Sequence, residues 1–206
     1  MLDFQILPVG PLACNCVLLW DAKAKTGVVV DPGDEAEKIS KRVNKLGVDI
    51  QAILLTHAHF DHLGAAAELQ WQWGCPVLLH PWDDPLLEHI GDQTASFGLP
   101  PIQKPNTEPL NGELPLGITM THTPGHSPGS SSFLADSVNG KLVLCGDTLF
   151  YQGVGRTDFW GGSWETLADS IRTKLYTLAP DTIVLSGHGP KTTIGAERKT
   201  NPYIQG

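Results

Sequence analysis

The stretch THAHFDHLG, residues 56–64, places three histidines and one aspartate within six consecutive positions. It directly follows an apolar run that predicts a buried strand. His57 and His59 are two residues apart, so at the end of an extended strand their side chains point the same way. Four ligands this close cannot easily surround one ion with tetrahedral angles. We therefore expect His57 and His59 to bind one metal ion, and Asp61 and His62 to bind a second.

Each of these pairs is too small to hold an ion, so other segments must supply further ligands. Three candidates stand at the ends of predicted strands, each directly after a glycine: His126 in TPGHSPG, Asp147 in LCGD and His188 in SGHGP. Glycine permits a sharp turn or a close approach, which helps to aim a side chain into a crowded site. Asp147 is the natural bridge, because a carboxylate has two oxygens while an imidazole binds through one nitrogen. The expected sites are therefore His57, His59, His126 and Asp147 for the first ion, and Asp61, His62, Asp147 and His188 for the second.

Both expected sites contain only nitrogen and oxygen ligands and leave a position for water, as catalytic metal sites do. Two ions about 3.5–4 Å apart would share a hydroxide and hold an attacked oxygen between them. Zinc is the expected metal, with iron and manganese as alternatives. The other histidines are interpreted as ordinary surface or hydrogen-bonded residues: His80, His89 and His122, of which His122 is also a candidate for supporting the site from behind.

Composition narrows the class of protein. The 206 residues include 14 basic and 22 acidic side chains, and no basic stripe of the kind that binds nucleic acid. The first residues lack the pattern of a signal peptide, and the apolar runs are too short to cross a bilayer, so we expect a cytoplasmic protein without membrane association. Cys14 and Cys16 would share one face of a strand and are interpreted as small buried hydrophobic residues, with a metal or redox pair as the alternative. No particular oligomeric state is predicted.

Short apolar runs alternate with amphipathic ones along the chain. Strands are predicted at residues 4–7, 16–20, 27–31, 52–55, 76–79, 117–123, 131–135, 141–145 and 181–185, and helices at 34–46, about 83–90, 63–73 and 163–178. Asp34 is the expected N-cap of the first helix and Gly47 its C-terminal stop. This order predicts helices flanking two stacked sheets. No linker or repeat is visible, and too few residues follow residue 190 for a second domain, so one domain over residues 1–206 is expected.

Four motifs together resemble the metallo-β-lactamase superfamily over nearly the whole chain: THAHFDH at 56–62, TPGHSPG at 123–129, CGD at 145–147 and SGHGP at 186–190. The resemblance implies an α/β fold, an αββα four-layer sandwich with the metals at the edge between two sheets. The segment VDPG at residues 30–33 resembles the family's first motif, whose aspartate, here Asp31, supports the metal loop rather than binding the ion.

Within the superfamily the chain resembles the glyoxalase II (hydroxyacylglutathione hydrolase) group, particularly its compact single-domain bacterial members. GVGRTDF at residues 153–159 and ERKTNPY at 197–203 carry this resemblance. It implies hydrolysis of a small-molecule thioester, such as the glutathione thioester S-lactoylglutathione, by a metal-bridging hydroxide. Asp147 and Asp61 would be the catalytic carboxylates, with Asp61 orienting the hydroxide rather than acting as a free base. Arg156 would contact the substrate, with a structural salt bridge as its alternative role.

The chain departs from the larger glyoxalase II enzymes in two respects. It is too short for their C-terminal helical domain, and Gly189 and Pro190 stand where they carry a tyrosine that contacts the substrate. Thioester chemistry is therefore better supported than exclusive glutathione binding. The closest alternative is an iron-dependent persulfide dioxygenase with one metal, and a lactonase of the same fold is another. A β-lactamase is disfavoured by the bridging Asp147 and the missing export signal, a nuclease by the acidic charge, and a non-catalytic scaffold by the intact ligand set.

Overall fold

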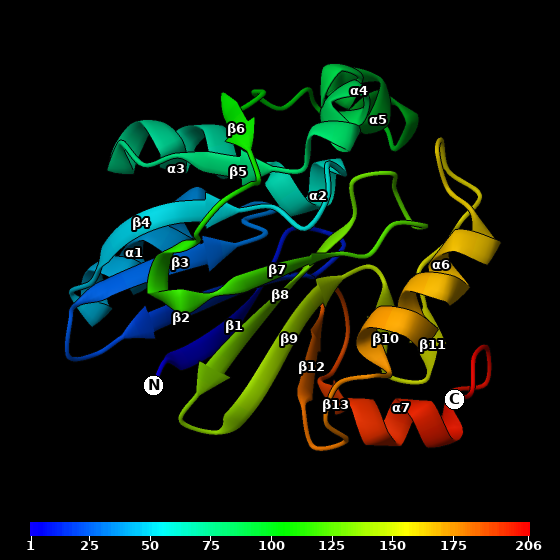
Figure 1. Cartoon of the computed structure of the whole chain (residues 1–206). Coiled ribbons are helices and arrows are strands. Elements are labelled where there is room, and N and C mark those ends of the chain that lie inside the picture. Colours follow the sequence, from blue (N-terminus) through cyan, green and yellow to red (C-terminus); the bar gives the residue numbers. More distant parts are fainter.

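Two β-sheets lie face to face in the computed structural model, which describes residues 1–206 (Figure 1). The first sheet has the order β1-β2-β3-β4-β5-β6 and comprises β1 (Asp3–Val9), β2 (Cys14–Asp21), β3 (Thr26–Val30), β4 (Asp49–Leu54), β5 (Val77–Leu79) and β6 (Thr107–Pro109). The second has the order β13-β12-β9-β8-β7 and comprises β7 (Thr119–His122), β8 (Ser131–Ser137), β9 (Gly140–Gly146), β12 (Ile183–Ser186) and β13 (Thr192–Thr193). A separate short ribbon pairs β10 (Leu149–Phe150) with β11 (Gly153–Val154).

Each sheet combines an antiparallel half with parallel strands. Strands β1 to β3 form an antiparallel meander, and β3 to β6 run parallel. In the second sheet β7, β8 and β9 are antiparallel neighbours, while β12 runs parallel to β9. The carboxyl ends of parallel strands meet at one edge, which is where loops on a rigid sheet can carry functional side chains. The loops that follow β4, β9 and β12 carry the predicted ligands His57, Asp147 and His188.

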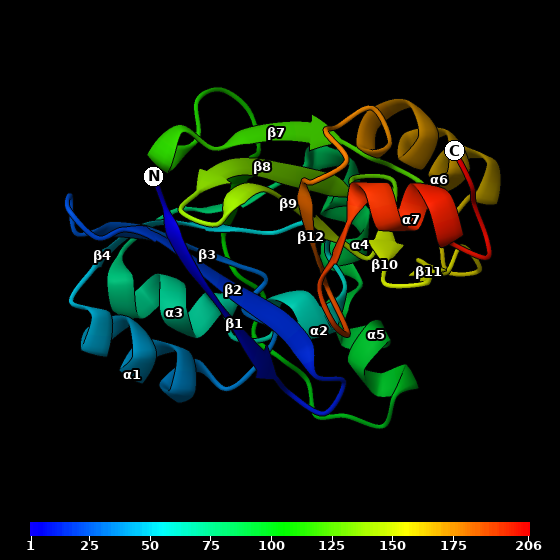
Figure 2. The same ribbon diagram turned by 90° about the horizontal axis from the view of Figure 1, so that it is seen from below.

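Helices cover both outer faces, so the predicted αββα four-layer sandwich is confirmed (Figure 2). The first sheet is covered by α1 (Ala36–Leu46) and α3 (Ala66–Trp73), and the second by α6 (Trp164–Ser170), its π-helical continuation Ile171–Leu175 and α7 (Ile194–Thr200). Three short helices lie near the ligand-bearing edge: α2 (Phe60–Leu63), α4 (Asp84–Glu88) and α5 (Ile90–Ser96). None of the helices is both long enough and apolar enough to cross a bilayer.

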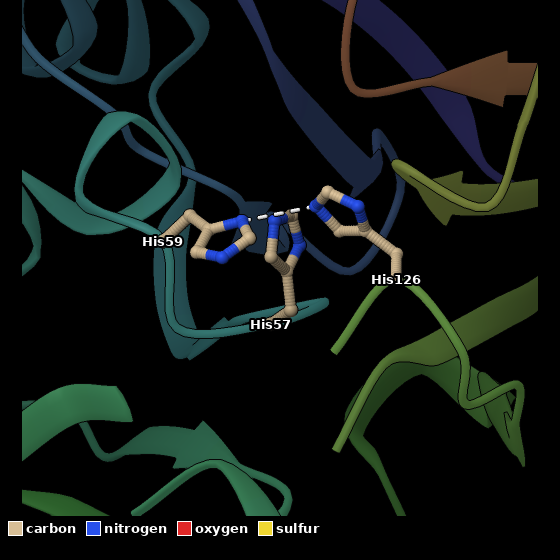
Figure 3. A group of neighbouring side chains, drawn as sticks. All are labelled: His57, His59 and His126. Carbon is tan, nitrogen blue, oxygen red and sulfur yellow. Dashed lines mark hydrogen bonds between the residues drawn. The ribbon is translucent and has the colours of Figure 1, made fainter. Parts of the chain in front are cut away.

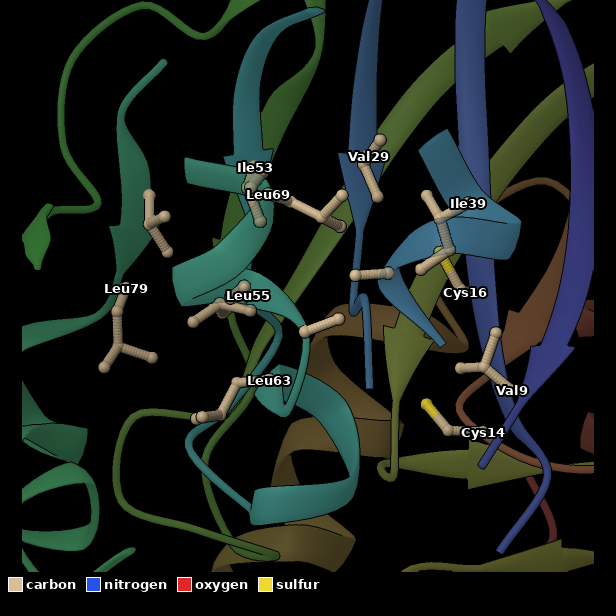
Figure 4. Packing of buried hydrophobic residues seen from close by; sticks show 14 of the residues in the cluster. Val9, Cys14, Cys16, Val29, Ile39, Ile53, Leu55, Leu63, Leu69 and Leu79 are labelled. Atoms are coloured by element: carbon tan, nitrogen blue, oxygen red, sulfur yellow. The ribbon is translucent and has the colours of Figure 1, made fainter. Parts of the chain in front are cut away.

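Three buried clusters separate the four layers. Along β2, Cys16 and Leu18 pack toward α1 and α3, whereas Val17 and Leu19 pack toward the second sheet. Figure 4 shows the first of these clusters, with Cys14 and Cys16 on the same side of the strand. Because β2 is buried on both faces, its sequence is a continuous apolar run rather than an alternating one. The expectation that the two cysteines are small buried hydrophobic residues on one face is confirmed, and both thiols are free.

The first helix begins later than predicted. Its first residue is Ala36, and Glu35 takes the N-cap position with a left-handed φ of 54° and no capping side chain. The carboxylate of Asp34 instead accepts a hydrogen bond from the backbone N–H of Glu35 at 2.6 Å. The cap expected from Asp34 was therefore wrong, because Glu35 precedes the first helical residue and the Asp34 carboxylate is bonded to the Glu35 N–H. Gly47 ends the helix as predicted, with a φ of 64° and its N–H bonded to the Val43 carbonyl at 3.0 Å.

The helix predicted over residues 63–73 begins later than expected, because Leu63 ends α2 and α3 starts at Ala66. The break between α2 and α3 lies at Gly64, where an added Cβ would lie 2.3 Å from the carbonyl oxygen of Gly33. The next residue, Ala65, donates its N–H to the Pro32 carbonyl at 2.9 Å. The helix is therefore interrupted where Gly64 and Ala65 contact the turn that follows β3. The segment 81–116, where one helix was expected, contains α4, α5 and β6, and α7 near the C-terminus was not predicted.

Candidate metal centre

The structure brings all seven predicted ligands together at the edge between the sheets. Their donor atoms form three overlapping groups, and within each group the atoms lie within 4.8 Å of one another. The groups are His57, His59 and His126; His57, His62 and Asp147; and Asp61, His62 and His188. We call the first group the upper group and the last the lower group. The overlap shows that the two expected half-sites are adjacent parts of one cluster.

The upper group comes from two separate turns. His57 and His59 lie on the loop between β4 and α2, and His126 lies on the turn between β7 and β8 (Figure 3). The Nε2 atom of His126 is 2.9 Å from Nδ1 of His59. The three rings are mutually steeply inclined, at 83–86°. Their nitrogens therefore converge on a small volume from different directions, as ligands of one ion must.

The lower group contains a carboxylate as well as imidazoles. The Oδ2 atom of Asp61 is 3.1 Å from Nε2 of His188 and 3.7 Å from Nε2 of His62. Asp147 lies between the two groups. Its Oδ1 is 3.4 Å from Nε2 of His62, while its Oδ2 is 3.7 Å from Nε2 of His126. The Asp147 carboxylate thus turns one oxygen toward each group.

Three polar atoms in the cluster are buried without a hydrogen-bond partner: Nε2 of His57, Nε2 of His62 and Oδ1 of Asp147. Leaving such an atom unsatisfied costs about 1–3 kcal/mol. A folded protein seldom accepts three such costs at one point unless something else satisfies the atoms. Because all three belong to groups with metal-ligand spacing, the residues present fit a pair of metal ions.

The outer nitrogens of the histidines are held by the surrounding chain. Nδ1 of His62 is 2.9 Å from Oδ2 of Asp31, Nδ1 of His126 is 2.7 Å from the Arg156 carbonyl, and Nδ1 of His188 is 3.0 Å from the Leu12 carbonyl. A hydrogen bond at one ring nitrogen fixes the tautomer and leaves the other nitrogen free to bind a metal. In each of these three residues Nε2 is the nitrogen that faces the cluster.

Asp31 supports the loop as the resemblance predicted. In addition to His62, its two oxygens accept hydrogen bonds from the backbone N–H and the hydroxyl of Thr56, at 2.8 and 2.7 Å. The Thr56 hydroxyl in turn lies 3.0 Å from Nδ1 of His57. Asp31 has a left-handed φ of 51°, which is uncommon for a residue other than glycine. This strained position lets one buried carboxylate orient ligands of both groups.

The electrostatic environment keeps His57, His59 and Asp147 in the protonation states that bind a metal. Burial, followed by the neighbouring imidazoles, lowers the pKa of His57 well below its usual range and that of His59 to about 3. Both rings are therefore neutral at neutral pH, as metal binding requires. Burial alone would raise the pKa of Asp147, but three facing imidazoles hold it below its usual value. Asp147 consequently remains an ionised carboxylate inside the cluster.

Glycines precede three of the predicted ligands, and all three are required by space. An added Cβ at Gly125 would lie 2.2 Å from the backbone nitrogen of Leu167. An added Cβ at Gly187 would lie 2.2 Å from Oδ1 of Asp147, and one at Gly146 would lie 2.3 Å from Oγ1 of Thr56. Gly146 also has a left-handed φ of 48°. The contacts at Gly187 and Gly146 confirm that these glycines permit a close approach of backbone to the cluster.

Asp83 is a buried residue near the cluster that the sequence did not single out. Its Oδ2 accepts hydrogen bonds from the Ala58 N–H at 3.0 Å and the Ser127 hydroxyl at 2.7 Å, and its Oδ1 accepts one from the Gly129 N–H at 2.6 Å. Ala58 lies between two ligands, and Ser127 follows His126 directly. One carboxylate therefore joins the two turns that carry the upper group. Burial raises the pKa of Asp83, against the effect of these hydrogen bonds.

Asn15 has a comparable position beneath the lower group. Its side-chain amide donates to the carbonyls of Ser186 and Gly189, at 3.0 and 2.9 Å, and its backbone N–H donates to Gly187 at 2.7 Å. The start of β2 thus holds the loop that carries His188. An isolated Asn or Asp carries no recognisable pattern, so neither Asn15 nor Asp83 could be found from spacing.

Arg156 lies at the rim of the cluster, paired with a neighbour. Its guanidinium makes two hydrogen bonds with the carboxylate of Asp158, at 2.9 and 2.7 Å, and lies 4.2 Å from the centre of the Phe159 ring. Of the other histidines, His89 pairs with Asp92 on the surface at 2.9 Å. The rings of His80 and His122 stack on each other. His122 also donates a hydrogen bond to the Pro128 carbonyl at 2.8 Å.

A cavity of about 760 Å³ opens from the cluster to solvent. Five of the seven predicted ligands line it: His59, Asp61, His126, Asp147 and His188. Its other walls are largely apolar and come from α2, α4, α5 and the segment 150–160. Arg156 lines the cavity and is the only Lys or Arg that does so. A small molecule can therefore reach the edge of the metal-ligand cluster.

Comparison with known proteins places this geometry among metal-dependent hydrolases. A family model described as the metallo-beta-lactamase superfamily matches residues 9–188. The hydroxyacylglutathione hydrolase GloC of Haemophilus influenzae is 38% identical, and the similarity covers 98% of each chain. These lengths agree closely, so the resemblance extends to the whole of that relative.

Two crystal structures are also similar. One, described as BLEG-1 B3 metallo-beta-lactamase, has a TM-score of 0.89 and 37% identity over 99% of this chain and 100% of that one. The other, described as TTHA1623 in a di-iron-bound form, has a TM-score of 0.88 and 40% identity over 97% of this chain and 100% of that one. The second structure demonstrates that a related chain of the same size can hold two metal ions.

Proposed function

We propose, from the premise that this chain belongs to the metallo-β-lactamase superfamily, that it is a two-metal hydrolase that cleaves a thioester such as S-lactoylglutathione. The observation that carries the proposal is the pair of adjacent ligand groups with Asp147 between them and three unpartnered buried donor atoms. The thioester part is supported by the 38% identity to a hydroxyacylglutathione hydrolase.

In this proposal the upper group, with Asp147, holds one ion, and the lower group, with Asp147, holds the other. Zinc is the expected metal, and the relative described as di-iron-bound supports iron as an alternative. Bound ions would supply Lewis acidity and a water whose pKa is lowered to about 7. The chain's own residues then have to hold the ions, admit the substrate and leave space for its carbonyl.

The carboxylates of the cluster are suited to holding charge rather than donating protons. Burial opposes ionisation of Asp61, but the facing His62 and His188 lower its pKa below the usual value. Asp61 is therefore ionised at neutral pH, as is Asp147, and neither offers an acidic proton to a leaving group. A thiolate needs no strong acid to leave, whereas an amine does. This favours thioesters among the acyl compounds that the site can accept.

A second candidate is hydrolysis of a β-lactam ring, and it is favoured by the similarity to the structure described as a B3 metallo-β-lactamase. A third, oxidation of a persulfide on one iron, follows from the sequence motifs of the 153–159 loop. It requires only one ion, whereas this cluster has donors for two. The three reactions differ in product and in metal requirement, so one set of assays distinguishes them.

The test uses purified protein loaded separately with zinc, iron or manganese. We expect hydrolysis of S-lactoylglutathione by protein with two bound ions, little hydrolysis of a chromogenic cephalosporin, and no oxygen uptake with glutathione persulfide. Removal of the ions with a chelator should abolish hydrolysis, and their return should restore it. Robust oxygen uptake on one iron without thioester hydrolysis would overturn the proposal, as would cephalosporin hydrolysis that exceeds thioester hydrolysis.

A further inference from the structure

The cavity beside the cluster has few polar groups left to recognise a substrate. Gln93, on its wall, accepts a hydrogen bond from the Phe60 N–H at 3.1 Å and donates to the carbonyls of Ala58 and Leu86 at 3.1 and 2.9 Å. Its amide is therefore occupied by the backbone. The hydroxyl of Ser96 donates to the Gln93 carbonyl at 2.7 Å. These side chains shape the wall and are not free to bind a ligand.

The charged groups of the cavity are also paired with each other. Arg156 is engaged through two nitrogens by Asp158, and His89 lies against Asp92. The two hydrogen bonds with Asp158 use Nε and Nη2 of Arg156 and offset its charge, so a carrier with free carboxylates, such as glutathione, gains less from an ion pair with Arg156 than it would from an unpaired guanidinium. It would also pass the carboxylate of Asp92 at the rim. Charge recognition of the carrier is consequently weak in this cavity.

Apolar rings, by contrast, begin at the ligands themselves. The Phe159 ring centre lies 5.5 Å from that of His59, and the Phe150 ring centre lies 6.5 Å from that of His188. A thioester carbonyl held at the cluster has two substituents, the acyl group and the sulfur carrier. Because a phenylalanine lies beside a ligand of each group, apolar surface is available to either substituent.

The apolar wall continues to the mouth of the cavity. Phe60 and Phe97 pack together with ring centres 5.0 Å apart, and Leu86 lies beside them on α4. Phe97 is 50% exposed and Trp160 is 62% exposed, although both line the cavity. Covering such rings with a ligand removes apolar surface from water, which is favourable at roughly 25 cal/mol per Å².

We infer that the cavity selects thioesters with an extended apolar acyl group, aliphatic or aromatic, over short hydroxyacyl groups on charged carriers. The inference rests on the proposed thioester hydrolysis and adds the substrate class to it. In the reaction, water supplies the new C–O bond, the C–S bond breaks, and the products are a carboxylic acid and a thiol. The chain's contribution to specificity is the apolar wall, with Phe97 and Trp160 as its outer specificity-determining residues.

The test compares acetyl, butanoyl and hexanoyl thioesters of N-acetylcysteamine, an uncharged carrier, with the same acyl groups on glutathione. We expect kcat/KM to rise about fourfold for each added methylene until the cavity is filled. The rise should be similar on both carriers, and S-lactoylglutathione should be a poorer substrate than the hexanoyl thioester.

Variants locate the effect. Phe97→Ala and Trp160→Ala, on separate segments, should each flatten the chain-length dependence, with the largest loss of kcat/KM for the hexanoyl thioester. Trp71→Ala is the matched control, because Trp71 is 87% exposed on α3 and does not line the cavity. Melting temperatures of the three variants verify that each is folded.

Three outcomes would contradict these claims. If the acetyl thioester is hydrolysed and kcat/KM stays flat or falls with chain length, the inferred specificity is wrong while the proposed function stands. If the protein holds two ions and hydrolyses no thioester of either series, the proposed function is wrong, and the inference falls with it. Unchanged chain-length dependence in both Phe97→Ala and Trp160→Ala would also contradict the inference.

Discussion

Asp147 is the single residue that faces both ligand groups, with Oδ1 3.4 Å from Nε2 of His62 and Oδ2 3.7 Å from Nε2 of His126. We expect Asp147→Ala to weaken the binding of both ions and to lower kcat/KM for the thioester by at least about 100-fold, more than the usual effect of a supporting residue. Metal analysis of the purified variant measures the first effect. Unchanged metal content and rate would refute the proposed bridge.

Asp83 should affect metal binding by the upper group more than metal binding by the lower group. Asp83→Ala removes the carboxylate that joins the turns of His57, His59 and His126. We expect the affinity for one of the two ions to fall about 10–100-fold, as is typical when a supporting partner of metal ligands is lost. Metal titration of the ion-free protein by calorimetry measures the two affinities separately.

Ser127→Ala is the milder companion variant, because it removes one of the three hydrogen bonds to Asp83 and leaves its charge in place. Its effect should be smaller and in the same direction. An equal loss of both ions in Asp83→Ala would indicate general destabilisation, and the assignment of Asp83 to the upper group would then be wrong.

Candidate ligands that stand close together in the sequence were predictable, whereas an isolated supporting residue such as Asp83 was not. His57, His59, Asp61 and His62 stand out because four ligand types within six positions are rare. Asp83 lies in an irregular segment rich in proline and aspartate, where its burial could not be foreseen. Its role depends on two loops, 25 and 44 or more residues away, that only the folded chain brings together.

At the scale of elements, α7 explains why two distant motifs occur together. Glu197 on α7 is fully buried and accepts hydrogen bonds from the Gln152 N–H at 2.9 Å and the Thr192 hydroxyl at 2.7 Å. Asn201 donates to Glu197 at 2.8 Å and to the Gly153 carbonyl at 3.0 Å. The ERKTNPY segment thus anchors the turn that begins the GVGRTDF loop, and so fixes the base of the segment that carries Arg156.

Breaking this anchor should cost stability. We expect Glu197→Ala to lower the free energy of unfolding by about 2–4 kcal/mol, because it leaves several buried donors without an acceptor. Chemical denaturation followed by circular dichroism measures the change. Glu165→Ala, at an exposed position in the first turn of α6, is the control and should change stability little. Equal stability of the two variants would remove Glu197 from this role.

The elements themselves were predicted where periodicity or a continuous apolar run was strong. Helix α1 and strands β2, β4, β9 and β12 were found because each buries a long apolar face. The division between α2 and α3 could not be foreseen, since it results from the contact of Gly64 with Gly33. The same limit applies to β10, β11 and α7, which are short and are held by tertiary hydrogen bonds.

At the scale of the whole molecule, bound ions should stabilise the fold in a pH-dependent manner. In the ion-free protein burial opposes a charge on His62, but nearby acidic groups raise its pKa well above 6.5. Protonated His62 therefore contributes stability that is present below the unfolded pKa and is lost as the pH rises through the folded one. An ion must displace this proton, so binding strengthens as the pH rises.

We expect the gain in Tm on adding zinc to shrink between about pH 8 and about pH 6, as apparent affinity falls up to tenfold per pH unit for each displaced proton. Differential scanning calorimetry of ion-free and zinc-loaded protein measures this gain. The gain should be restored when the pH is raised again. A gain independent of pH would show that His62 carries no proton in the ion-free state.

The architecture was predictable from the order of strands and helices, because strands apolar on both faces must lie between layers. The grouping of the seven candidate ligands was predictable because the superfamily motifs place them at strand ends. The character of the cavity was not predictable, since its walls come from α5 and from residues 150–160, which meet only across the cluster. Substrate preference is therefore a property of the assembled molecule.

The most direct test of the two-metal thioester hydrolase is titration of the ion-free protein with zinc while S-lactoylglutathione and S-hexanoyl-N-acetylcysteamine hydrolysis are followed. The account predicts that kcat reaches its maximum only when a second equivalent of zinc has bound, and that chelation reverses this rise. Full activity at one equivalent, or no hydrolysis of either thioester with two equivalents bound, would contradict it.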